Sequence, residues 1–340
     1  MHIFVTGGAG FIGSAFLRLA LNENSDYRVT NFDALTYAGN LDNLEGLKSE
    51  RYKFIKGDIA NRSEVLEALT SDVDAIINLA AESHVDRSIL SADDFIRTNV
   101  LGTQVLLDAA RECGVRRFVQ VSTDEVMGSL PEETDSYFTE QSPFAPNSPY
   151  AASKAAAEHL VRAAHHTFGT DTVVTRCGNN YGPRQFPEKF LPLLISNAIH
   201  DKPIPVYGDG KNVRDWIYVD DHCRGILLAL QKGRTDGVYN FGARNERRNI
   251  DVVQSLLDML NKPHSLIKFV KDRPGHDRRY AIDPILAEKE LGWAPLETWE
   301  SGLQKTIEWY KSNPKWIERA KSGEYRKYYA EQYGPEVTAI

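Results

Sequence analysis

The stretch Ile3-Phe-Val-Thr-Gly-Gly-Ala-Gly-Phe-Ile-Gly13 determines the fold that we expect for this chain. An apolar, strand-like segment runs into Gly7, Gly10 and Gly13, and a helical pattern follows. Glycines let the backbone turn tightly and approach a pyrophosphate, whose negative charge then lies at the amide-rich N-terminus of the helix. A glycine-rich turn alone is weak evidence, but the strand before it and the helix after it predict a dinucleotide-binding site.

Short apolar runs alternate with longer amphipathic ones along the first half of the chain. This alternation predicts βαβ units, and therefore an α/β fold with a Rossmann-like, doubly wound parallel sheet. The runs are almost wholly apolar, as expected of strands that helices cover on both faces. The expected strands are Ile3–Thr6, Val29–Asp33, Lys53–Asp58, Ala75–Ala80, Phe118–Ser122 and Thr172–Cys177. Helical patterns lie near residues 11–22, 62–70, 91–113 and 150–168.

The second expected strand ends at Asp33, twenty residues after Gly13. A carboxylate at this position accepts hydrogen bonds from the adenosine ribose and repels a 2′-phosphate. The next two residues carry no positive charge that could hold such a phosphate, so the sequence favours NAD over NADP. Asp58 and Ile59, at the end of the third strand, are placed to line the adenine, although Asp58 could also be an ordinary strand-end cap.

After about residue 178 the pattern becomes irregular, because prolines divide it into short pieces. We therefore expect an NAD-binding domain over residues 1–178 and a smaller C-terminal α/β lobe for the substrate over most of residues 179–340. Residues 213–241 are expected to return to the main sheet. The tail after Pro314 is polar and aromatic, and the sequence assigns it no function.

Composition narrows the class of protein. The formal net charge of -7 on 340 residues argues against non-specific nucleic-acid binding, although a local basic pocket for phosphates stays compatible with it. No apolar run approaches the roughly 20 residues that a membrane span needs. The three cysteines lie far apart without metal-ligand spacing, and no leader pattern follows Met1. We therefore expect a cytoplasmic protein that binds no metal, no nucleic acid and no membrane.

A second motif, Tyr150-Ala-Ala-Ser-Lys154, opens the helical pattern at residues 150–168. The spacing of four places both side chains on one helical face. The ammonium group and the positive nicotinamide ring would both favour the tyrosine phenolate, so the pair suits alcohol oxidation by hydride transfer. The motif is common by chance, but Ser122 and Thr123 end the fifth strand, where ligands of such sheets bind. Together with the glycine-rich turn, these residues predict an NAD-dependent oxidation.

Two adjacent carboxylates, Asp124 and Glu125, follow that strand end directly. Such a pair is often part of a solvated loop. On a sugar oxidised at C4, however, a base could take the C5 proton while an acid protonates the departing C6 hydroxyl. Return of the hydride to C6 would give a 4-keto-6-deoxy sugar. A sugar-nucleotide 4-epimerase or a uronate decarboxylase would not need this pair. A non-catalytic NAD-binding regulator would need neither this pair nor Tyr150 and Lys154. These remain the alternatives.

With these residues in place, the chain resembles the dTDP-glucose 4,6-dehydratases, which belong to the extended short-chain dehydrogenases/reductases. The resemblance spans residues 1–312. It rests on Leu79-Ala-Ala-Glu-Ser-His-Val-Asp-Arg-Ser88, Ser122-Thr-Asp-Glu-Val126, Asn147-Ser-Pro-Tyr-Ala-Ala-Ser-Lys154, Arg176-Cys-Gly-Asn-Asn-Tyr-Gly-Pro183, Tyr207-Gly-Asp-Gly210, Asn212-Val-Arg-Asp-Trp216 and Asp272-Arg-Pro-Gly-His-Asp-Arg-Arg-Tyr280. Immediately before Gly128, where the family usually has tyrosine, this chain has Met127. We expect this difference to cause at most altered packing or tuning near the site.

The resemblance implies a role for each matched residue. Thr123 would hydrogen-bond the C4 oxygen, Asp124 would be the acid at C6 and Glu125 the base at C5, with Tyr150 and Lys154 as the oxidising pair. NAD would be held by Gly7, Gly10, Phe11, Ile12, Gly13, Asp33, Ala34, Leu35, Thr36, Asp58, Ile59, Leu79, Ala80, Ala81, Ser83, Thr98, Ser122, Tyr150, Lys154 and Asn180. The nucleotide sugar would contact Ser83, Thr123, Asn179, Lys189, Phe190, Pro205, Val206, Tyr207, Arg214, Asn249, Arg273 and His276, with the arginines on the diphosphate.

The resemblance also implies a homodimer, because in this family the two long helices, near residues 91–113 and 150–168, pair between subunits. The nucleobase of the substrate stays open. The bases of thymidine and uridine diphosphate sugars differ by one methyl group, which is worth roughly 1–3 kcal/mol in a pocket.

Overall fold

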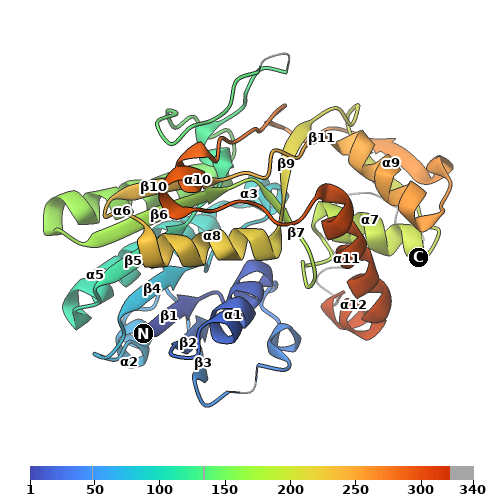
Figure 1. Ribbon diagram of the computed structural model, residues 1–340. Coiled ribbons are helices and arrows are strands. Elements are labelled where there is room, and N and C mark those ends of the chain that lie inside the picture. Colours follow the sequence, from blue (N-terminus) through green and yellow to red (C-terminus); the bar gives the residue numbers. More distant parts are fainter. Residues whose placement is uncertain (48, 133–134, 322–340) are drawn as a thin grey trace.

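The computed structural model describes residues 1–47, 49–132 and 135–321. Seven parallel strands form the main sheet, in the order β10-β6-β5-β4-β1-β2-β3 (Figure 1). They are β1 (His2–Thr6), β2 (Arg28–Asp33), β3 (Tyr52–Lys56), β4 (Ala75–Asn78), β5 (Arg117–Val121), β6 (Asp171–Cys177) and β10 (Gly237–Phe241). The six strands expected from the sequence are present, and the predicted doubly wound α/β fold is confirmed.

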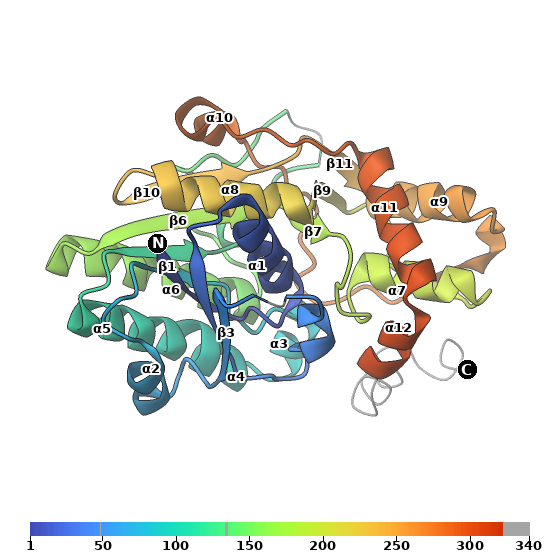
Figure 2. The same cartoon turned by 60° about the horizontal axis from the view of Figure 1, so that its bottom comes forward.

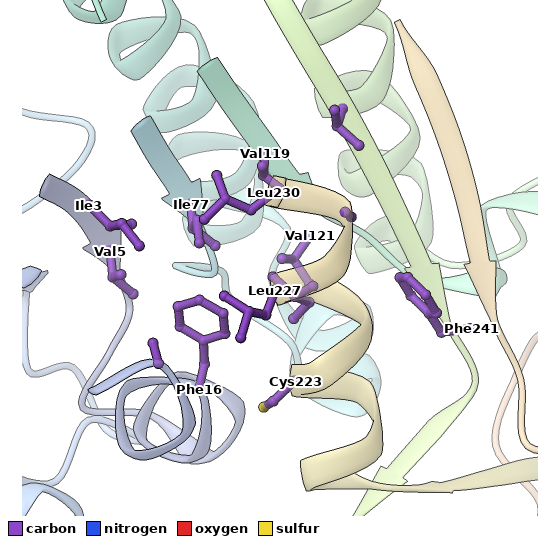
Figure 3. Close-up of a cluster of buried hydrophobic side chains, with 14 of the residues drawn as sticks. Ile3, Val5, Phe16, Ile77, Val119, Val121, Cys223, Leu227, Leu230 and Phe241 are labelled. Carbon is purple, nitrogen blue, oxygen red and sulfur yellow. The ribbon is translucent and has the colours of Figure 1, made fainter. Parts of the chain in front are cut away.

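Helices cover both faces of this sheet (Figure 2). One layer holds α1 (Phe11–Glu23), α8 (Val219–Lys232) and α10 (Ile285–Leu291); the other holds α2 (Arg62–Ala68), α5 (Thr103–Cys113) and α6 (Pro149–Phe168). Alternate residues of β1 enter the two cores. Ile3 and Val5 pack with Phe16 of α1 and Leu227 of α8, as Figure 3 shows, whereas Phe4 packs on the opposite face. Burial on both faces explains why the strands are apolar throughout.

The helix expected near residues 91–113 has three parts. It begins as α4 (Asp93–Phe95), continues as the π-helical segment η2 (Ile96–Gly102) and ends as α5, and α3 (Val85–Leu90) precedes it. A Cβ atom at Gly102 would lie 2.6 Å from the Ile59 side chain. Glycine therefore allows η2 to approach the segment that follows β3.

The smaller lobe has two small sheets and a core of its own. The three-stranded sheet has the order β11-β9-β7, and β12 pairs with β8. Aromatic side chains such as Trp216, Trp299 and Tyr310 fill the core between them and the helices. The elements are β7 (Asn179–Tyr181), α7 (Phe190–Ile199), β8 (Ile204–Tyr207), β9 (Val213–Tyr218), β11 (Glu246–Arg248), α9 (Asn249–Leu260), β12 (Ile267–Val270), α11 (Trp299–Ser312) and α12 (Pro314–Ala320). Short 3₁₀ turns are η1 (Leu41–Leu44), η3 (Asp124–Met127) and η4 (His264–Leu266).

The segment 213–241, expected to return to the main sheet, divides between the two parts. α8 and β10 lie on and in the main sheet, but β9 pairs with β7 and β11 in the smaller lobe. The chain therefore returns to the main sheet only from Val219, where α8 begins. The division of the chain at residue 178 stays a prediction. The tail after Pro314 begins with α12, and its residues 322–340 lie outside the described residues. None of the described helices combines the length and the apolar character that crossing a membrane requires.

Candidate active site

The glycine-rich turn lies between β1 and α1. Gly7 has a φ of +70°, and a Cβ atom there would lie 2.6 Å from the backbone nitrogen of Ala80, so only glycine fits. Gly10 precedes α1, whose first turn has neither an acidic residue nor a side-chain cap among the residues that the structure describes. The amides of that turn are therefore open to an anion, because a helix N-terminus carries partial positive charge.

Asp33 ends β2 and is almost fully buried. Its Oδ2 accepts a hydrogen bond from the amide of Ala9 (2.8 Å), and its Oδ1 accepts one from the amide of Leu35 (2.8 Å). Burial raises the pKa of this carboxyl, while the two amides oppose the rise. Asp33 thus anchors the glycine-rich turn, a role that the sequence spacing did not reveal.

A cavity of about 340 Å³ brings most of the predicted site together. All predicted NAD contacts except Leu35 line it: Gly7, Gly10, Phe11, Ile12, Gly13, Asp33, Ala34, Thr36, Asp58, Ile59, Leu79, Ala80, Ala81, Ser83, Thr98, Ser122, Tyr150, Lys154 and Asn180. Thr123, Asp124, Glu125, Asn179 and Lys189 line the same cavity. Lining residues that the sequence analysis missed include Glu82, Arg97, Gln185 and Phe186. Arg97 forms an ion pair with Asp58, whose other oxygen caps the following turn through the amide of Ala60.

The two adjacent carboxyls lie in η3, and Thr123 caps this turn. The hydroxyl of Thr123 accepts from the amide of Glu125 (3.3 Å) and donates to Asp124 Oδ1 (3.3 Å). Asp124 is 1% exposed, and among the described residues its Oδ2 has no hydrogen-bond partner. Burial, followed by the charges of Glu125 and Asp215, raises the pKa of Asp124 well above its ordinary value. This setting favours the protonated form of the Asp124 carboxyl.

Glu125 has a different electrostatic setting. Burial raises its pKa too, but the positive charges of Arg273, Arg214 and Lys189 oppose the rise. At Glu125 three cations oppose the rise and one carboxylate, Asp277, adds to it, whereas at Asp124 two carboxylates add to the rise and one cation, Arg214, opposes it. Environments that treat two neighbouring carboxyls differently are the usual basis for dividing acid and base roles.

Tyr150 and Lys154 lie in the first turns of α6. Ser148 caps this helix by accepting from the amide of Ala151 (3.1 Å), which fixes the turn that carries Tyr150. The ammonium of Lys154 donates to the Val121 carbonyl (2.6 Å), and burial lowers its pKa to about 8. Burial, followed by the charge of Glu125, raises the pKa of Tyr150 well above its ordinary value in the chain by itself, so the expected phenolate depends on the positive nicotinamide ring as well as on Lys154.

The predicted diphosphate ligands surround Glu125 from the side of the smaller lobe. The guanidinium of Arg214, on β9, lies 4.2 Å from the centre of the Tyr280 ring and donates to the Asp277 carbonyl (2.9 Å). Arg273 donates from one terminal nitrogen to Asp86 (3.2 Å), and its buried Nε has no partner among the described residues. An arginine whose one terminal nitrogen is fixed by a carboxylate, and whose buried Nε–H has no acceptor in the described part of the protein, suits recognition of an anion.

The other predicted substrate residues lie in the smaller lobe and do not line this cavity. The hydroxyl of Tyr207 donates to Asp86 (3.2 Å), and the rings of Tyr207 and His276 form a T-shaped contact. Burial lowers the pKa of His276 to about 4. Val206 is buried in the lobe's core. Pro205 lies beside it on β8, Phe190 begins α7 against Trp216, and Asn249 begins α9.

Met127 is buried beside an ion pair in the interior. Arg176 and Glu158, each with a side chain 4% exposed, lie 2.8 Å apart, and a second nitrogen of Arg176 donates to the Met127 sulfur (3.7 Å). Met127 is therefore part of the packing below η3, in agreement with the packing role expected for it.

Asp215 is a functional candidate that the sequence analysis missed, although it adjoins Arg214 in a quoted motif. It is 1% exposed, its Oδ1 accepts from the amide of Asn245 (2.8 Å), and burial raises its pKa to about 6. Its negative charge is one of the causes that raise the pKa of Asp124. Sequence proximity could not indicate this, because residues 124 and 215 lie on separate elements.

Asp215→Asn should change the pH dependence of stability. In the wild type, unfolded chains lose this proton above pH 3.8, whereas folded chains keep it until about pH 6. The folded state is therefore favoured at low pH, and the free energy of unfolding falls by about 3 kcal/mol as pH rises through this window. Asparagine does not titrate, so the free energy of unfolding of the variant does not fall for this reason. Urea unfolding of both proteins should show the variant gaining about 3 kcal/mol relative to the wild type between about pH 4 and pH 7; a constant difference would contradict the raised pKa.

Comparison with known proteins places the chain among nucleotide-sugar enzymes. The family described as GDP-mannose 4,6 dehydratase matches residues 4–306. A dTDP-glucose 4,6-dehydratase of Escherichia coli is 48% identical, covering 98% of this chain and 99% of that one. The dTDP-glucose 4,6-dehydratase of Streptomyces venezuelae, solved with NAD bound, superposes with a TM-score of 0.91 at 47% identity, covering 94% of this chain and 100% of that chain. A UDP-glucose 4-epimerase of Thermotoga maritima reaches a TM-score of 0.85 at 28% identity, over 92% of this chain and 100% of that one.

Proposed function

The chain belongs to the dTDP-glucose 4,6-dehydratases, within the GDP-mannose 4,6 dehydratase family, and we propose that its site converts dTDP-glucose to dTDP-4-keto-6-deoxy-glucose. One observation carries this conclusion. The carboxyls of Asp124, which is buried, and Glu125, which is partly buried, line the same cavity as Tyr150, Lys154 and the glycine-rich turn. A 4-epimerase has no use for an acid and a base beside the oxidising residues, whereas removal of water across C5 and C6 requires both.

NAD fits the cavity. The open amides of α1 suit its pyrophosphate, Asp33 faces the position of the adenosine ribose, and Lys154 would hold the nicotinamide ribose. When bound, NAD supplies reversible oxidation and reduction of the sugar. A Cβ atom at Gly7 or Gly13 would collide with the backbone at Ala80 or at Gly7 and Gly8, so glycine at both positions permits the tight turn that approaches the pyrophosphate.

The residues of the chain move the protons. Tyr150 takes the proton of the C4 hydroxyl, and the hydroxyl of Thr123 donates to the C4 oxygen. Glu125, whose ionised form the charges of Arg273, Arg214 and Lys189 favour, is the base that removes the C5 proton and returns a proton to C5 once C6 has been reduced. Asp124, whose protonated form burial favours, donates to the departing C6 hydroxyl so that it leaves as water. Arg214 and Arg273 bind the diphosphate, and Asn179 and Lys189 contact the sugar side of the cavity.

The proposed reaction is tested by incubating the purified protein with dTDP-glucose and identifying the product. A 4-keto-6-deoxy sugar, recognised by its absorbance in alkali and its mass, supports the proposal. A galactose epimer would show that the 4-epimerase reaction is correct, and a pentose formed from UDP-glucuronate in a parallel incubation would show that the decarboxylase reaction is correct. Parallel kinetics with UDP-glucose measure how strongly the site selects the thymidine nucleotide, whose methyl group we expect to be worth roughly tenfold or more in kcat/KM.

Asp33→Ala should weaken the retention of NAD. The variant loses the ribose acceptor and also both amide bonds that hold the glycine-rich turn, so we expect the dissociation constant of NAD to rise about a hundredfold. Calorimetry, together with the NAD content after gel filtration, provides the measurement. Asp26→Ala, an exposed carboxyl before the same strand, is the control. An unchanged NAD content would remove Asp33 from both roles.

The proposed assembly is a homodimer. Support comes from exposed apolar side chains on adjoining helices: Ile89 and Leu90 on α3, Ile96 and Leu101 on η2, and Phe168 at the end of α6. α5 and α6 run side by side on this face (Figure 2), as a paired helical interface requires.

Leu101→Glu should therefore convert the dimer to monomers in sedimentation equilibrium, because it would bury a charge in the interface. Leu296→Glu, at a side chain 73% exposed in a loop, should leave the dimer intact. A wild-type protein that sediments as a monomer, or a dimer that Leu101→Glu does not alter, would exclude this helical face as the interface.

We also propose the cytoplasm as the compartment of the protein. The thiols of Cys113, Cys177 and Cys223 are all free, as a reducing environment allows. Fractionation of cells that express the chain would test this, and recovery outside the cytoplasmic fraction would contradict it.

A further inference from the structure

The C-terminal helix α12, to which the sequence assigned no function, is joined to the glycine-rich turn by buried hydrogen bonds. The indole N–H of Trp316, on α12, donates to the side-chain oxygen of Asn43 in η1 (2.9 Å). The side-chain amide of Asn43 donates in turn to the carbonyl of Ala9 in the glycine-rich turn (2.9 Å). Asn43 is 1% exposed and Trp316 5% exposed, so water competes little for either bond. Figures 1 and 2 show the segment with η1 between α1 and α12.

The peptide group between Ala9 and Gly10 is the point where this contact acts. Its carbonyl oxygen accepts from Asn43 and from the backbone amide of Asn40 (3.1 Å), and its N–H, which is that of Gly10, donates to the Gly7 carbonyl (3.2 Å). In a trans peptide the C=O and N–H bonds point in opposite directions. Fixing the Ala9 oxygen toward η1 therefore keeps it away from the anion site at the start of α1.

The glycine in this peptide makes it easier to rotate. Gly10 follows Ala9, and glycine permits backbone conformations that other residues avoid. A rotated peptide would turn a carbonyl oxygen toward the pyrophosphate, which would repel it. The hydrogen bonds that the Ala9 oxygen accepts from Asn43 and Asn40, and the one that the Gly10 amide donates to Gly7, oppose this rotation.

We propose that Trp316 and Asn43 are positioning residues for NAD: through their buried hydrogen bonds, helix α12 holds the Ala9 carbonyl away from the phosphate-binding face of the turn. This inference concerns the binding of NAD, so it can succeed or fail independently of the dehydration reaction. The Arg319–Asp42 ion pair joins α12 to the same turn of η1 and supports the same contact.

The decisive variant is Trp316→Phe, which keeps an aromatic ring in the lobe's core but removes the N–H group. The side-chain oxygen of Asn43 is then left buried without its donor. We expect the dissociation constant of NAD to rise about tenfold, with the dissociation constant of dTDP unchanged within about twofold. Hydrogen exchange of the amides of residues 8–12, measured in protein stripped of NAD, should become faster.

Trp309→Phe is the matched control. The Trp309 ring lies 5.0 Å from that of Trp316 in the same cluster, yet within the described part of the chain its indole nitrogen has no hydrogen-bond partner. This control should retain wild-type NAD affinity. A general loss of packing would affect both variants, and would alter dTDP affinity as well as NAD affinity.

Asn43→Ala is the second variant, and it keeps the inference testable if Trp316→Phe does not fold. It removes both bonds of the bridge without changing the aromatic cluster and should weaken NAD at least as much as Trp316→Phe. The inference is overturned if NAD affinity is unchanged in the folded variants, or if NAD and dTDP affinities fall together.

Discussion

Glu125→Gln should lower the rate of product formation about a thousandfold, because glutamine cannot accept the C5 proton. Oxidation at C4 does not need this base, so the variant should stop after that step. Reduced NAD then accumulates on the enzyme when dTDP-glucose is added, and its near-ultraviolet absorbance measures the extent. The substitution changes one atom and leaves the hydrogen-bonding outline of the side chain nearly intact.

The control for this variant is Glu140→Gln. Burial raises the pKa of Glu140 as it does that of Glu125, but Glu140 does not line the cavity. It should turn over at close to the wild-type rate. If Glu125→Gln itself forms product at the wild-type rate, or fails without accumulating reduced NAD, Glu125 is not the C5 base.

Tyr150→Phe should also reduce turnover about a thousandfold, but at the earlier step. The variant loses only the phenolic oxygen, so the ring still packs against Phe95. Without a group to take the C4 hydroxyl proton, oxidation fails, and no reduced NAD should appear after dTDP-glucose is added. Binding of NAD and of dTDP, measured separately by calorimetry, should stay within about twofold of the wild type.

Comparison of the two variants separates the two halves of the reaction. Both lose product, but only Glu125→Gln should show reduced NAD. If Tyr150→Phe reduces NAD as quickly as the wild type, the proton of the C4 hydroxyl leaves by another route, and the assignment of Tyr150 is wrong.

The sequence predicted those parts of the molecule that depend on neighbours along the chain. Apolar runs such as Val29–Asp33 correspond to strands within two residues at each end, because burial on both faces leaves little choice of residue. The glycine-rich turn and the Tyr150–Lys154 spacing predicted two regions of one cavity for the same reason: each is a local motif. The acid and base roles came from chemistry and from the family resemblance.

Long-range contacts could not be predicted in this way. Trp316 and Asn43 are separated by 273 residues, and nothing in either segment indicates the other. The same holds for Asp215 beside Asp124 and for Asp86, which accepts from both Arg273 and Tyr207. The depth at which Tyr150 is buried, which raises its pKa, is likewise a property of the folded chain that the Tyr150–Lys154 spacing does not indicate.

The two bonds of Asp33 have a consequence for changing the coenzyme that the protein uses. Engineering such an enzyme toward NADP usually means removing the acidic residue that excludes the extra phosphate. Here the same carboxylate accepts hydrogen bonds from the amides of Ala9 and Leu35. Its removal therefore also destabilises the glycine-rich turn that binds either coenzyme. A switch of preference therefore needs at least two coordinated changes, one that admits the phosphate and one that provides a new anchor for Ala9.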